Sequence, residues 1–288
     1  MFEIILTFSC ADQPGIVAAV ASHFAERGFN IKESSQFEDE QSGQFFMRTK
    51  LGAPATGKVE GSQLEAIKAA FAPIASQYQM DWQIHDANQP MKVVIAVSKW
   101  GHCLNKLLNN YKRGSLPIEV VAVVSNHPDM AEVCEWYQVP YHHLAVNNQN
   151  REQQEQQILE IMQQTDAELL VLARYMQILS DDMCQALPGK IINIHHSFLP
   201  GFKGAKPYHQ AHERGVKLIG ATAHYVTSDL DEGPIIEQAV ERVSHANTVD
   251  ELVEIGRDSE SVVLQRAVRW HAEHRVILNG QKTIVFSR

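Results

Sequence analysis

Asn193 and His195 stand two residues apart at the end of the apolar run KIINIHH, residues 190–196. Side chains two residues apart in a strand point to the same face, so these two can converge on one ligand atom while Ile194 points into the core. The amide of Asn193 can donate a hydrogen bond to a carbonyl oxygen that gains negative charge. The imidazole of His195 can exchange a proton near neutral pH. The pair therefore predicts acid–base chemistry on a carbonyl-type group.

A carboxylate that could complete this set comes later, in the loop sequence DLDEGP at residues 229–234. Asp231 in that loop can hold His195 in its charged form and orient a water molecule. His224 lies on the strand that leads into the loop, where it can hydrogen-bond to Asp231. His196 follows His195 directly, and in a strand it points to the opposite face. Its role is left open between a solvent-facing side chain and a support for the reacting groups.

Three other interpretations of the same residues stay open. A histidine and an asparagine at a strand end are often structural, and Asn193 and Ser197 could simply cap turns. Metal binding is disfavoured, because His195 and His196 point to opposite faces and the chain has no HExxH motif. A serine nucleophile is disfavoured because the chain has no GxSxG motif. We therefore expect a site without a metal or any other cofactor.

The elements that must position these residues form a regular pattern from residue 91 onward. Apolar runs suited to buried parallel strands alternate with helical patterns, which predicts an open, doubly wound, Rossmann-like α/β domain with a mostly parallel sheet. Ligands of such sheets bind beyond the carboxyl ends of the strands, where the NIHH stretch is expected. Residues 222–243 alternate apolar and polar side chains, as an antiparallel hairpin would. Residues 248–276 form a long helical stretch that Thr248 or Asp250 could cap.

The N-terminal segment has a different pattern. A strand and a helix are followed by two strands around the polar turn EDEQSG, a helix with a proline in its middle, and a closing strand. This βαββαβ order is typical of a ferredoxin-like sandwich. Gly28 is placed to end the first helix. The stretch ANQP, residues 87–90, links this segment to the next, so we expect two domains, residues 1–87 and residues 91–288.

The composition narrows the class of protein. The 288 residues are 44% hydrophobic and 20% charged, and the net charge of −9 argues against nucleic acid as the main partner. No run approaches the ~20 apolar residues of a membrane helix, and the N-terminus lacks the features of a signal peptide. The four cysteines are isolated, without a CxxC pair. We expect a cytoplasmic protein that does not bind membranes.

Two stretches, INIHHSFLPGFKG and GATAHYVTSDLDEGPIIEQ, resemble the formyltransferase family that uses 10-formyltetrahydrofolate. Segments that resemble this family cover the chain from about residue 91 to about residue 270. The resemblance implies that Asn193, His195 and Asp231 are catalytic, and that the stretch RYMQILS contacts the pterin ring of the substrate. Lys203 would meet the glutamate tail of folate or remain solvated. The candidate substrate-binding residues are Met176, Gln177, Ile178, Leu179, His224 and Lys203.

The stretch ADQPGIVAAVASHFAERGFNI, residues 11–31, resembles an ACT domain. Domains of this family bind small amino acids at subunit interfaces and regulate an attached enzyme. The resemblance implies that the chain forms a homo-oligomer, either a dimer or a tetramer. The residues that it assigns to effector binding are Asp12, Pro14, Gly15 and Asn30.

An ACT domain ahead of a formyltransferase-like domain is similar to the arrangement in the formyltetrahydrofolate deformylase family. That resemblance implies hydrolysis of 10-formyltetrahydrofolate to formate and tetrahydrofolate, with folate as the substrate rather than a cofactor. It also implies that the formate serves purine biosynthesis and that the reaction balances one-carbon pools. Methionine and glycine are the amino-acid effectors that the resemblance suggests.

Formyl transfer to an amine, as in glycinamide ribonucleotide formyltransferase, is the main alternative. The loop VSKWGHCLNKLL, residues 97–108, carries the bulky Trp100 at the position where that transferase has small residues. Small residues there let backbone N–H groups reach a substrate phosphate. Lys99 could still meet a phosphate, so this alternative stays open. A sensor without enzymatic activity is a further alternative, although it would have no need of the catalytic set.

Overall fold

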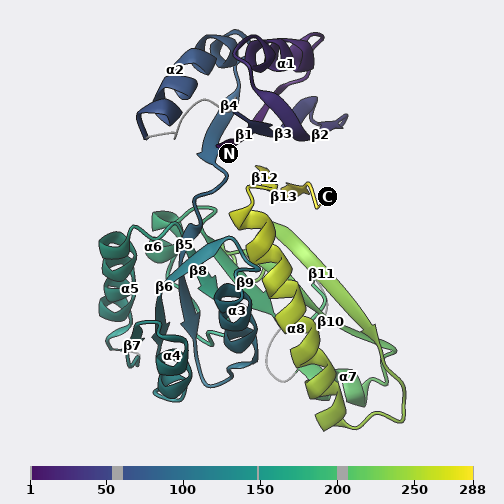
Figure 1. The fold of residues 1–288 in the computed structure, drawn as a ribbon. Coiled ribbons are helices and arrows are strands. Elements are labelled where there is room, and N and C mark those ends of the chain that lie inside the picture. Colours follow the sequence, from purple (N-terminus) through teal and green to yellow (C-terminus); the bar gives the residue numbers. More distant parts are fainter. Residues whose placement is uncertain (1, 54–60, 148, 200–206, 288) are drawn as a thin grey trace. The chain divides into compact units, whose positions relative to one another are not determined.

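The chain folds into two compact units (Figure 1). The computed structural model describes residues 2–53, 61–147, 149–199 and 207–287. The second unit comprises Met91–Ala272 and Gly280–Thr283. The first comprises Met1–Pro90 together with Glu273–Asn279 and Ile284–Arg288 from the tail of the chain. The tail, which we assigned from the sequence to the domain at residues 91–288, therefore packs mainly with the N-terminal unit.

The first unit has the βαββαβ order that the sequence predicts, with four antiparallel strands in the spatial order β2-β3-β1-β4. Its core lies between the sheet and the helices, and includes Leu6, Phe8, Val20, Phe24 and Phe71. The elements are β1 (Glu3–Ala11), α1 (Ile16–Glu26), β2 (Asn30–Asp39), β3 (Gln44–Gly52), α2 (Gly61–Gln77) and β4 (Asp81–Asp86).

Helix α1 ends at the glycine that the sequence indicates. Gly28 has a φ of 78°, in the left-handed region. Its N–H donates to the carbonyl of Ala25 at 2.9 Å, and the N–H of Phe29 donates to the carbonyl of Phe24 at 3.0 Å. Together these bonds form a Schellman motif, which satisfies carbonyls that the helix end would otherwise leave without partners.

On the other face of this sheet, which neither of the unit's described helices covers, Ile5, Phe46 and Arg48 are nevertheless buried. The tail supplies part of the cover: β12 (Val276–Asn279) and β13 (Lys282–Val285) pair with each other, and Phe286 follows them in a buried position.

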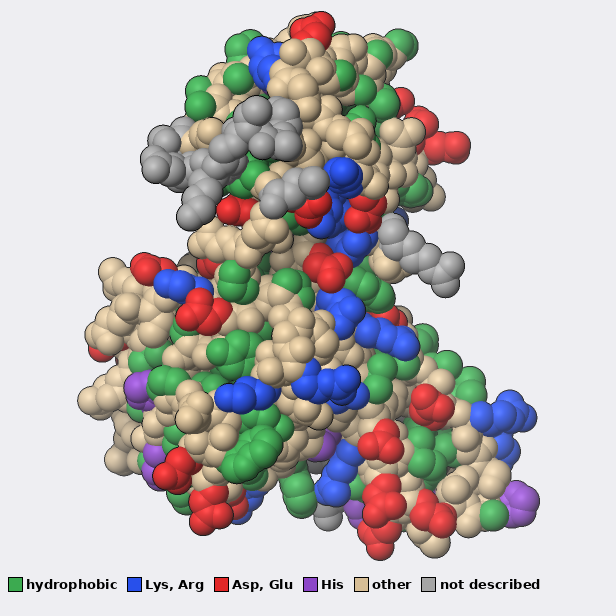
Figure 2. Space-filling view, in the orientation of Figure 1, with side chains coloured by type: hydrophobic (Ala, Val, Ile, Leu, Met, Phe, Trp, Pro, Cys, Tyr) green, Lys and Arg blue, Asp and Glu red, His purple; other side chains and the backbone are tan. Residues whose placement is uncertain are grey.

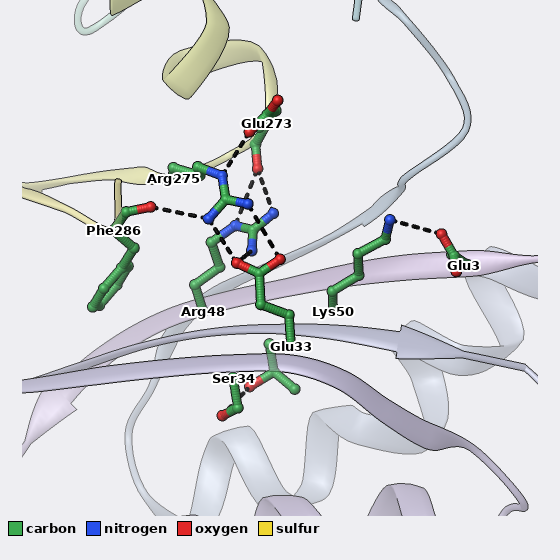
Figure 3. A network of polar contacts seen from close by, with 9 residues as sticks. Glu3, Glu33, Ser34, Arg48, Lys50, Glu273, Arg275 and Phe286 are labelled. Atoms are coloured by element: carbon green, nitrogen blue, oxygen red, sulfur yellow. Dashed lines mark hydrogen bonds and ion pairs between the residues drawn. The ribbon is translucent and has the colours of Figure 1, made fainter. Parts of the chain in front are cut away.

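Four charged side chains, Glu33, Arg48, Glu273 and Arg275, tie the tail to the sheet (Figure 3). Glu33 pairs with Arg48 at 3.1 Å and with Arg275 at 2.6 Å. Arg275 also pairs with the carboxylate of Glu273 at 2.6 Å, and Arg48 donates to the carbonyl oxygen of Glu273 at 2.9 Å. We call this set the Arg48 network. It explains why the tail belongs with the N-terminal unit, since a buried arginine needs these acceptors.

The second unit is built on a sheet of seven strands in the order β11-β10-β9-β8-β5-β6-β7. The strands from β9 to β7 are parallel, and β10 and β11 form the antiparallel hairpin that the sequence predicts. The strands are β5 (Met91–Val97), β6 (Ile118–Ser125), β7 (Tyr141–His143), β8 (Leu169–Leu172), β9 (Ile191–His195), β10 (Leu218–Tyr225) and β11 (Ile235–Arg242).

Helices cover both faces of this sheet. Side chains of α5 and α6 pack with β5, β6 and β8 on one face, whereas α3 and α8 contact each other and the sheet on the other face (Figure 1). None of the described helices combines the length and the apolar character needed to cross a membrane. The helices are α3 (His102–Lys112), α4 (Ala131–Tyr137), α5 (Arg151–Thr165), α6 (Asp181–Ala186), α7 (Pro207–Glu213) and α8 (Val249–Ala272).

Helix α8 begins with a capping box. The hydroxyl of Thr248 accepts from the N–H of Glu251 at 3.3 Å, and the carboxylate of Glu251 accepts from the N–H of Thr248 at 2.8 Å. Of the two capping candidates in the sequence, Thr248 therefore caps the helix, while Asp250 lies in the first turn. Acidic side chains gather around this end of α8 (Figure 2), where they interact favourably with the helix dipole.

The chain changes direction in the middle of the sheet. From β5 it proceeds outward to β6 and β7, and then returns to place β8 on the other side of β5. Such a switch point leaves a crevice at the carboxyl ends of the strands. Ser98 holds the two sides of the crevice together: its N–H donates to the carbonyl of Arg174 at 3.3 Å, and its hydroxyl accepts from the N–H of Met176 at 3.0 Å.

Candidate active site

A cavity of about 600 Å³ lies at this crevice. Its wall is built from the segments that follow β5 and β8, the end of β9, the loop after β10, and side chains of α7 and α8. The structure thus brings together almost every substrate-binding or catalytic candidate from the sequence; Lys203 is the exception, because it lies outside the described residues. The candidates in the wall are Met176, Gln177, Ile178, Leu179, Asn193, His195, His224 and Asp231.

His195 and Asp231 form a pair. The Nδ1 atom of His195 lies 3.3 Å from a carboxylate oxygen of Asp231. This hydrogen bond holds the pKa of Asp231 below its ordinary value, although burial opposes the shift. Asp231 has a φ of 57°, which is uncommon for a residue other than glycine. Backbone strain of this kind is found at functional sites, and here it accompanies the approach of the carboxylate to His195.

His224 fixes the amide of Asn193. The two residues are cross-strand partners on β10 and β9, and their Nε2 and Nδ2 atoms lie 3.3 Å apart. The Nδ1 atom of His224 lies 2.9 Å from the carbonyl oxygen of Tyr225, so it carries the hydrogen. Burial lowers the pKa of His224, which leaves Nε2 free to accept from the Asn193 amide. We expected His224 to bond to Asp231; that carboxylate is 3.7 Å away, beyond hydrogen-bond distance.

The Nε2 atom of His195 has no hydrogen-bond partner among the described residues, although it is buried. Because Nδ1 is engaged by Asp231, Nε2 is the atom that can exchange a proton with a ligand in the cavity. An unsatisfied buried polar atom is costly in a protein interior, and such atoms in native structures often mark a site of ligand binding or catalysis. The arrangement can therefore bind a polar ligand atom between Asn193 and His195 and move a proton there.

The structure corrects the expected direction of His196. We predicted from strand alternation that it points away from His195, but both histidines line the cavity. Their ring centroids are 5.1 Å apart, and the ring of His196 lies 6.3 Å from that of Tyr208. The alternation fails because β9 ends at His195. Burial, followed by the charge of Arg174, lowers the pKa of His196 to about 4, so this side chain is neutral at physiological pH.

A second group of polar side chains lines the cavity, and sequence reasoning did not identify it as a site. We call it the Glu260 cluster: His102, Arg174, Tyr208 and Glu260. Glu260 accepts from Tyr208 at 2.8 Å and faces His102 at 2.7 Å and Arg174 at 3.4 Å. Burial alone would raise the pKa of Glu260, but the bond to His102 and the charge of Arg174 hold it below its ordinary value.

His102, Cys103 and Glu260 also have the spacing of a metal site, with possible ligand atoms within 4.8 Å of one another. Their chemistry fits a metal poorly. Burial raises the pKa of Cys103, so the sulfur remains a thiol. Both oxygens of Glu260 already have partners, and the guanidinium of Arg174 stands beside them. These residues are better described as a hydrogen-bonded charge cluster, and the absence of a metal cofactor stays a prediction.

The candidate folate residues form an apolar side of the cavity. The segment from Arg174 to Leu179 is irregular rather than the start of a helix; α6 begins only at Asp181, capped by the hydroxyl of Ser180. Met176 and Ile178 are more than half exposed, whereas Leu179 is buried. A row of apolar side chains of this kind suits a flat heteroaromatic ring.

The four effector candidates in the first unit do not meet within one copy of the chain. Asp12, Pro14 and Gly15 follow the end of β1, which pairs with the start of β3 at Gln44. Asn30 starts β2 and pairs with Gly52 at the other end of β3. The strand between these ends spans about 26 Å. All four could contact one small ligand only if a second copy supplied part of the site.

Known families match both units. A family model described as formyl transferase matches residues 91–268, and one described as ACT domain matches residues 4–67. The chain is 49% identical over 281 residues to the formyltetrahydrofolate deformylase of Corynebacterium sp. (strain P-1), with 98% of this chain and 97% of that protein covered.

Solved structures show the same likeness. The formyltetrahydrofolate deformylase from Burkholderia mallei superimposes with a TM-score of 0.93 at 47% identity, covering 99% of this chain and 100% of that one. Glycinamide ribonucleotide transformylase 1 from Symbiobacterium toebii superimposes with a TM-score of 0.65 at 30% identity, covering 70% of this chain and 96% of that one.

Proposed function

This chain belongs to the formyltetrahydrofolate deformylase family, and we propose that it hydrolyses 10-formyltetrahydrofolate to formate and tetrahydrofolate. The observation that carries the proposal is the meeting of Asn193, His195 and Asp231 in one cavity beside an apolar ring-binding side. The pterin would lie against Met176–Leu179, which places the formyl group at the polar end. No metal or other cofactor is required, because the chain's own groups supply the hydrogen bonds and the proton transfers.

The formyl oxygen would be bound between the amide of Asn193 and Nε2 of His195. When water adds to the formyl carbon, this oxygen becomes an oxyanion, and both groups can hydrogen-bond to it more strongly than to the carbonyl. The orientation of Asn193 by His224 prepares the donor before the reaction begins. Preorganised donors of this kind contribute more than mobile ones, because they need not reorient as charge develops.

The His195–Asp231 pair would handle the protons. It takes a proton from the attacking water, and it returns a proton to N10 as the carbon–nitrogen bond breaks. N10 carries an aniline-type lone pair that is delocalised into the ring, so it leaves more readily than an alkyl amine. Water supplies the new oxygen of formate; one of its protons stays on N10 of tetrahydrofolate, and the other passes to solvent as formic acid ionises to formate. The depressed pKa of Asp231 keeps it ionised and ready to orient the water.

The direct test is release of formate from 10-formyltetrahydrofolate with water as the only acceptor. We expect formate and tetrahydrofolate in equal amounts. Formyl transfer to an amine is the second candidate, favoured by the structural likeness to a transformylase. It predicts no product until an amine is added. A folate or amino-acid sensor predicts binding of the folate without any turnover.

Regulation and cellular role follow from the ACT unit and the proposed products. We propose that a small amino acid, methionine or glycine, binds between two copies of the chain and changes the rate of hydrolysis, so that the chain works as a dimer or tetramer. The formate would supply purine biosynthesis, and the reaction would balance one-carbon pools. A cytoplasmic location accords with four cysteines that are all free and buried. Formate release with and without each amino acid, together with the mass in solution, tests this part.

A further inference from the structure

The cavity wall beside His195 includes the side chains of His196, Tyr208 and Glu260. His196 lies next to His195, and Tyr208 follows at the positions described above. The hydroxyl of Tyr208 is bonded to Glu260, whose other oxygen faces His102 and Arg174. These side chains form a part of the cavity wall that the folate residues do not supply. We call His196, Tyr208 and Glu260 the acceptor wall.

Tyr208 is also held by the shape of α8. A Cβ atom placed on Gly256 would lie 2.0 Å from the hydroxyl oxygen of Tyr208 and 2.2 Å from its ring carbon Cζ. Only glycine lets the phenol come this close to the helix backbone. Glu260 stands one turn further along the same helix, so Gly256 provides the space and Glu260 provides the hydrogen bond. Two independent features of α8 thus fix one aromatic ring in the wall.

We propose that the acceptor wall keeps amines away from the formyl carbon and so restricts the attacking nucleophile to water. This inference rests on the proposed hydrolysis and goes further, because it assigns the choice of nucleophile to particular residues. Water is a single heavy atom and needs no room behind it. An amine carries a carbon chain on the far side of its nitrogen, and His196 and Tyr208 occupy the space next to His195.

The wall is also unsuited to accept a proton from an amine. A primary amine is largely an ammonium ion near neutral pH and must lose a proton before it can attack. Glu260 could attract such an ion, but both its oxygens are engaged by Tyr208, His102 and Arg174.

The competing reaction differs only in the nucleophile. If an amine entered, its nitrogen would form the new bond to the formyl carbon, the bond from that carbon to N10 would break, and the amine proton would pass to N10. The products would be a formamide and tetrahydrofolate, in place of formate and tetrahydrofolate. The ratio of formamide to formate therefore reports which nucleophile reaches the carbon, whatever the total rate.

The test uses the full-length protein, 10-formyltetrahydrofolate and glycinamide as a primary amine probe. N-formylglycinamide and formate are both quantified by mass spectrometry in the same sample, with a blank that lacks protein. For the wild type we expect formate and only blank levels of N-formylglycinamide. Tyr208→Ala and His196→Ala open the wall, and each should raise the ratio by about tenfold or more, the lower end of what a change in pocket shape contributes to discrimination.

Two further variants distinguish the bulk of the Tyr208 ring from the effect of its hydroxyl group. Tyr208→Phe keeps the ring and loses only the hydroxyl, so its ratio should stay near the wild-type value. Gly256→Ala removes no cavity group, but it forces the Tyr208 ring to move, so its ratio should differ from the wild-type value. Because both products come from the same tube, partial loss of folded protein lowers them equally. If Tyr208→Ala fails to fold, His196→Ala and Gly256→Ala decide the matter.

The inference is overturned if the opened variants release formate with an unchanged ratio, or if the wild type formylates glycinamide as readily as water. Failure of the proposed function is a separate result, because the wild type would then release no formate without an amine. A wild type that is inactive until glycinamide is added would overturn both. A ratio that rises in the opened variants and stays low in Tyr208→Phe supports the acceptor wall.

Discussion

Ionised side chains are buried in both units, and one group from each unit shows a difference in how its polar atoms are paired. In the Arg48 network of the first unit, each carboxylate faces an arginine, and Arg48 also reaches a carbonyl oxygen (Figure 3). In the cavity of the second unit, Asp231 has His195 as its partner, but the far nitrogen of His195 has none among the described residues.

That difference separates a structural group from a reactive one. A buried charge set in which each charge faces an opposite one holds elements together, here the tail against the sheet; Nη1 of Arg48 lacks hydrogen-bond geometry but lies 3.1 Å from the carboxylate of Glu33. A set that ends in an unpaired nitrogen facing a cavity has something to offer a ligand. We therefore expect substitutions in the Arg48 network to lower the stability of the first unit with little effect on turnover. Substitutions around Asp231 should lower turnover with little effect on the stability of the first unit.

Asp231→Asn should give the largest effect. An amide keeps the shape of the carboxylate but cannot accept the water proton, so formate release should fall by about 10³-fold, within the range that general acid–base groups contribute. Binding of 10-formyltetrahydrofolate should change little. Asp229→Asn is the matched control, because Asp229 is exposed in the same loop. Near wild-type formate release by Asp231→Asn would show that the pair with His195 is as structural as the Arg48 network.

Arg48→Met tests the structural role of the Arg48 network. It removes the charge but keeps the length of the side chain, and it should destabilise the first unit by about 3 kcal/mol, the lower end for removing one partner of a buried ion pair. Glu33 keeps Arg275, which limits the loss. Urea denaturation with hydrogen exchange in β1, β3 and β12 measures it. Lys50→Met, which breaks the more exposed pair with Glu3, should cost about 0–1 kcal/mol.

Turnover by folded Arg48→Met provides the sharper comparison. The rate of formate release per folded molecule should match the wild type without an effector. A large fall in that rate would mean that the Arg48 network is part of the catalytic apparatus, and the separation drawn between the two groups would be wrong.

Asn193→Ala should come next. It removes one donor to the oxyanion, and formate release should fall by about 10²-fold, the lower end for such donors, because His195 remains. The loss should appear in kcat rather than in KM, since the folate contacts at Met176–Leu179 are untouched. An effect confined to KM would show that Asn193 binds the ground state instead. Ser98→Ala removes the hydroxyl that accepts from the N–H of Met176, so this variant should raise KM and leave kcat nearly unchanged.

The smallest expected effect concerns pH, and it occurs in both units. Burial lowers the pKa of His85 in the first unit and of His196 in the second to about 4. Below about pH 6.5 the two histidines become protonated in the unfolded chain, whereas in the folded chain they stay neutral until about pH 4. The stability of each unit should therefore fall as pH decreases from 6.5 towards 4.

Single substitutions show which histidine causes the dependence of stability on pH in each unit. Thermal unfolding at pH 7 and pH 5 should show a smaller difference for His85→Asn in the first unit, and for His196→Asn in the second. If the midpoints of these variants keep the full wild-type dependence on pH, then neither histidine is held neutral by its surroundings.

Local features of the fold were predictable because their causes lie close together in the sequence. The capping box of Thr248 and Glu251 and the glycine that ends α1 are short-range patterns, and both are observed. The pattern of strands and helices likewise predicted the βαββαβ order of the first unit, and the parallel strands and the hairpin of the second, but not the short strand β7. Asn193 and His195 share a cavity because the period of a strand fixes the direction of neighbouring side chains.

Features that depend on distant segments were not predictable in the same way. The Glu260 cluster draws its members from α3, the segment after β8, α7 and α8, so no window of the sequence contains it. The tail was assigned from the sequence to the second unit because nothing near Arg275 in the sequence shows that its distant partner is Glu33 in β2. The direction of the His196 side chain was predicted wrongly, because the alternation of side chains holds only within the strand and β9 ends at His195.

The central claim is that water attacks a formyl group held between Asn193 and His195. Reaction of 10-formyltetrahydrofolate in H₂¹⁸O, with no amine present, tests it most directly through the mass of the formate released. We predict rapid release of formate that carries one solvent oxygen, in step with tetrahydrofolate, and loss of that signal in Asp231→Asn. Formate released equally fast by Asp231→Asn, or no labelled formate from the wild type, would contradict it.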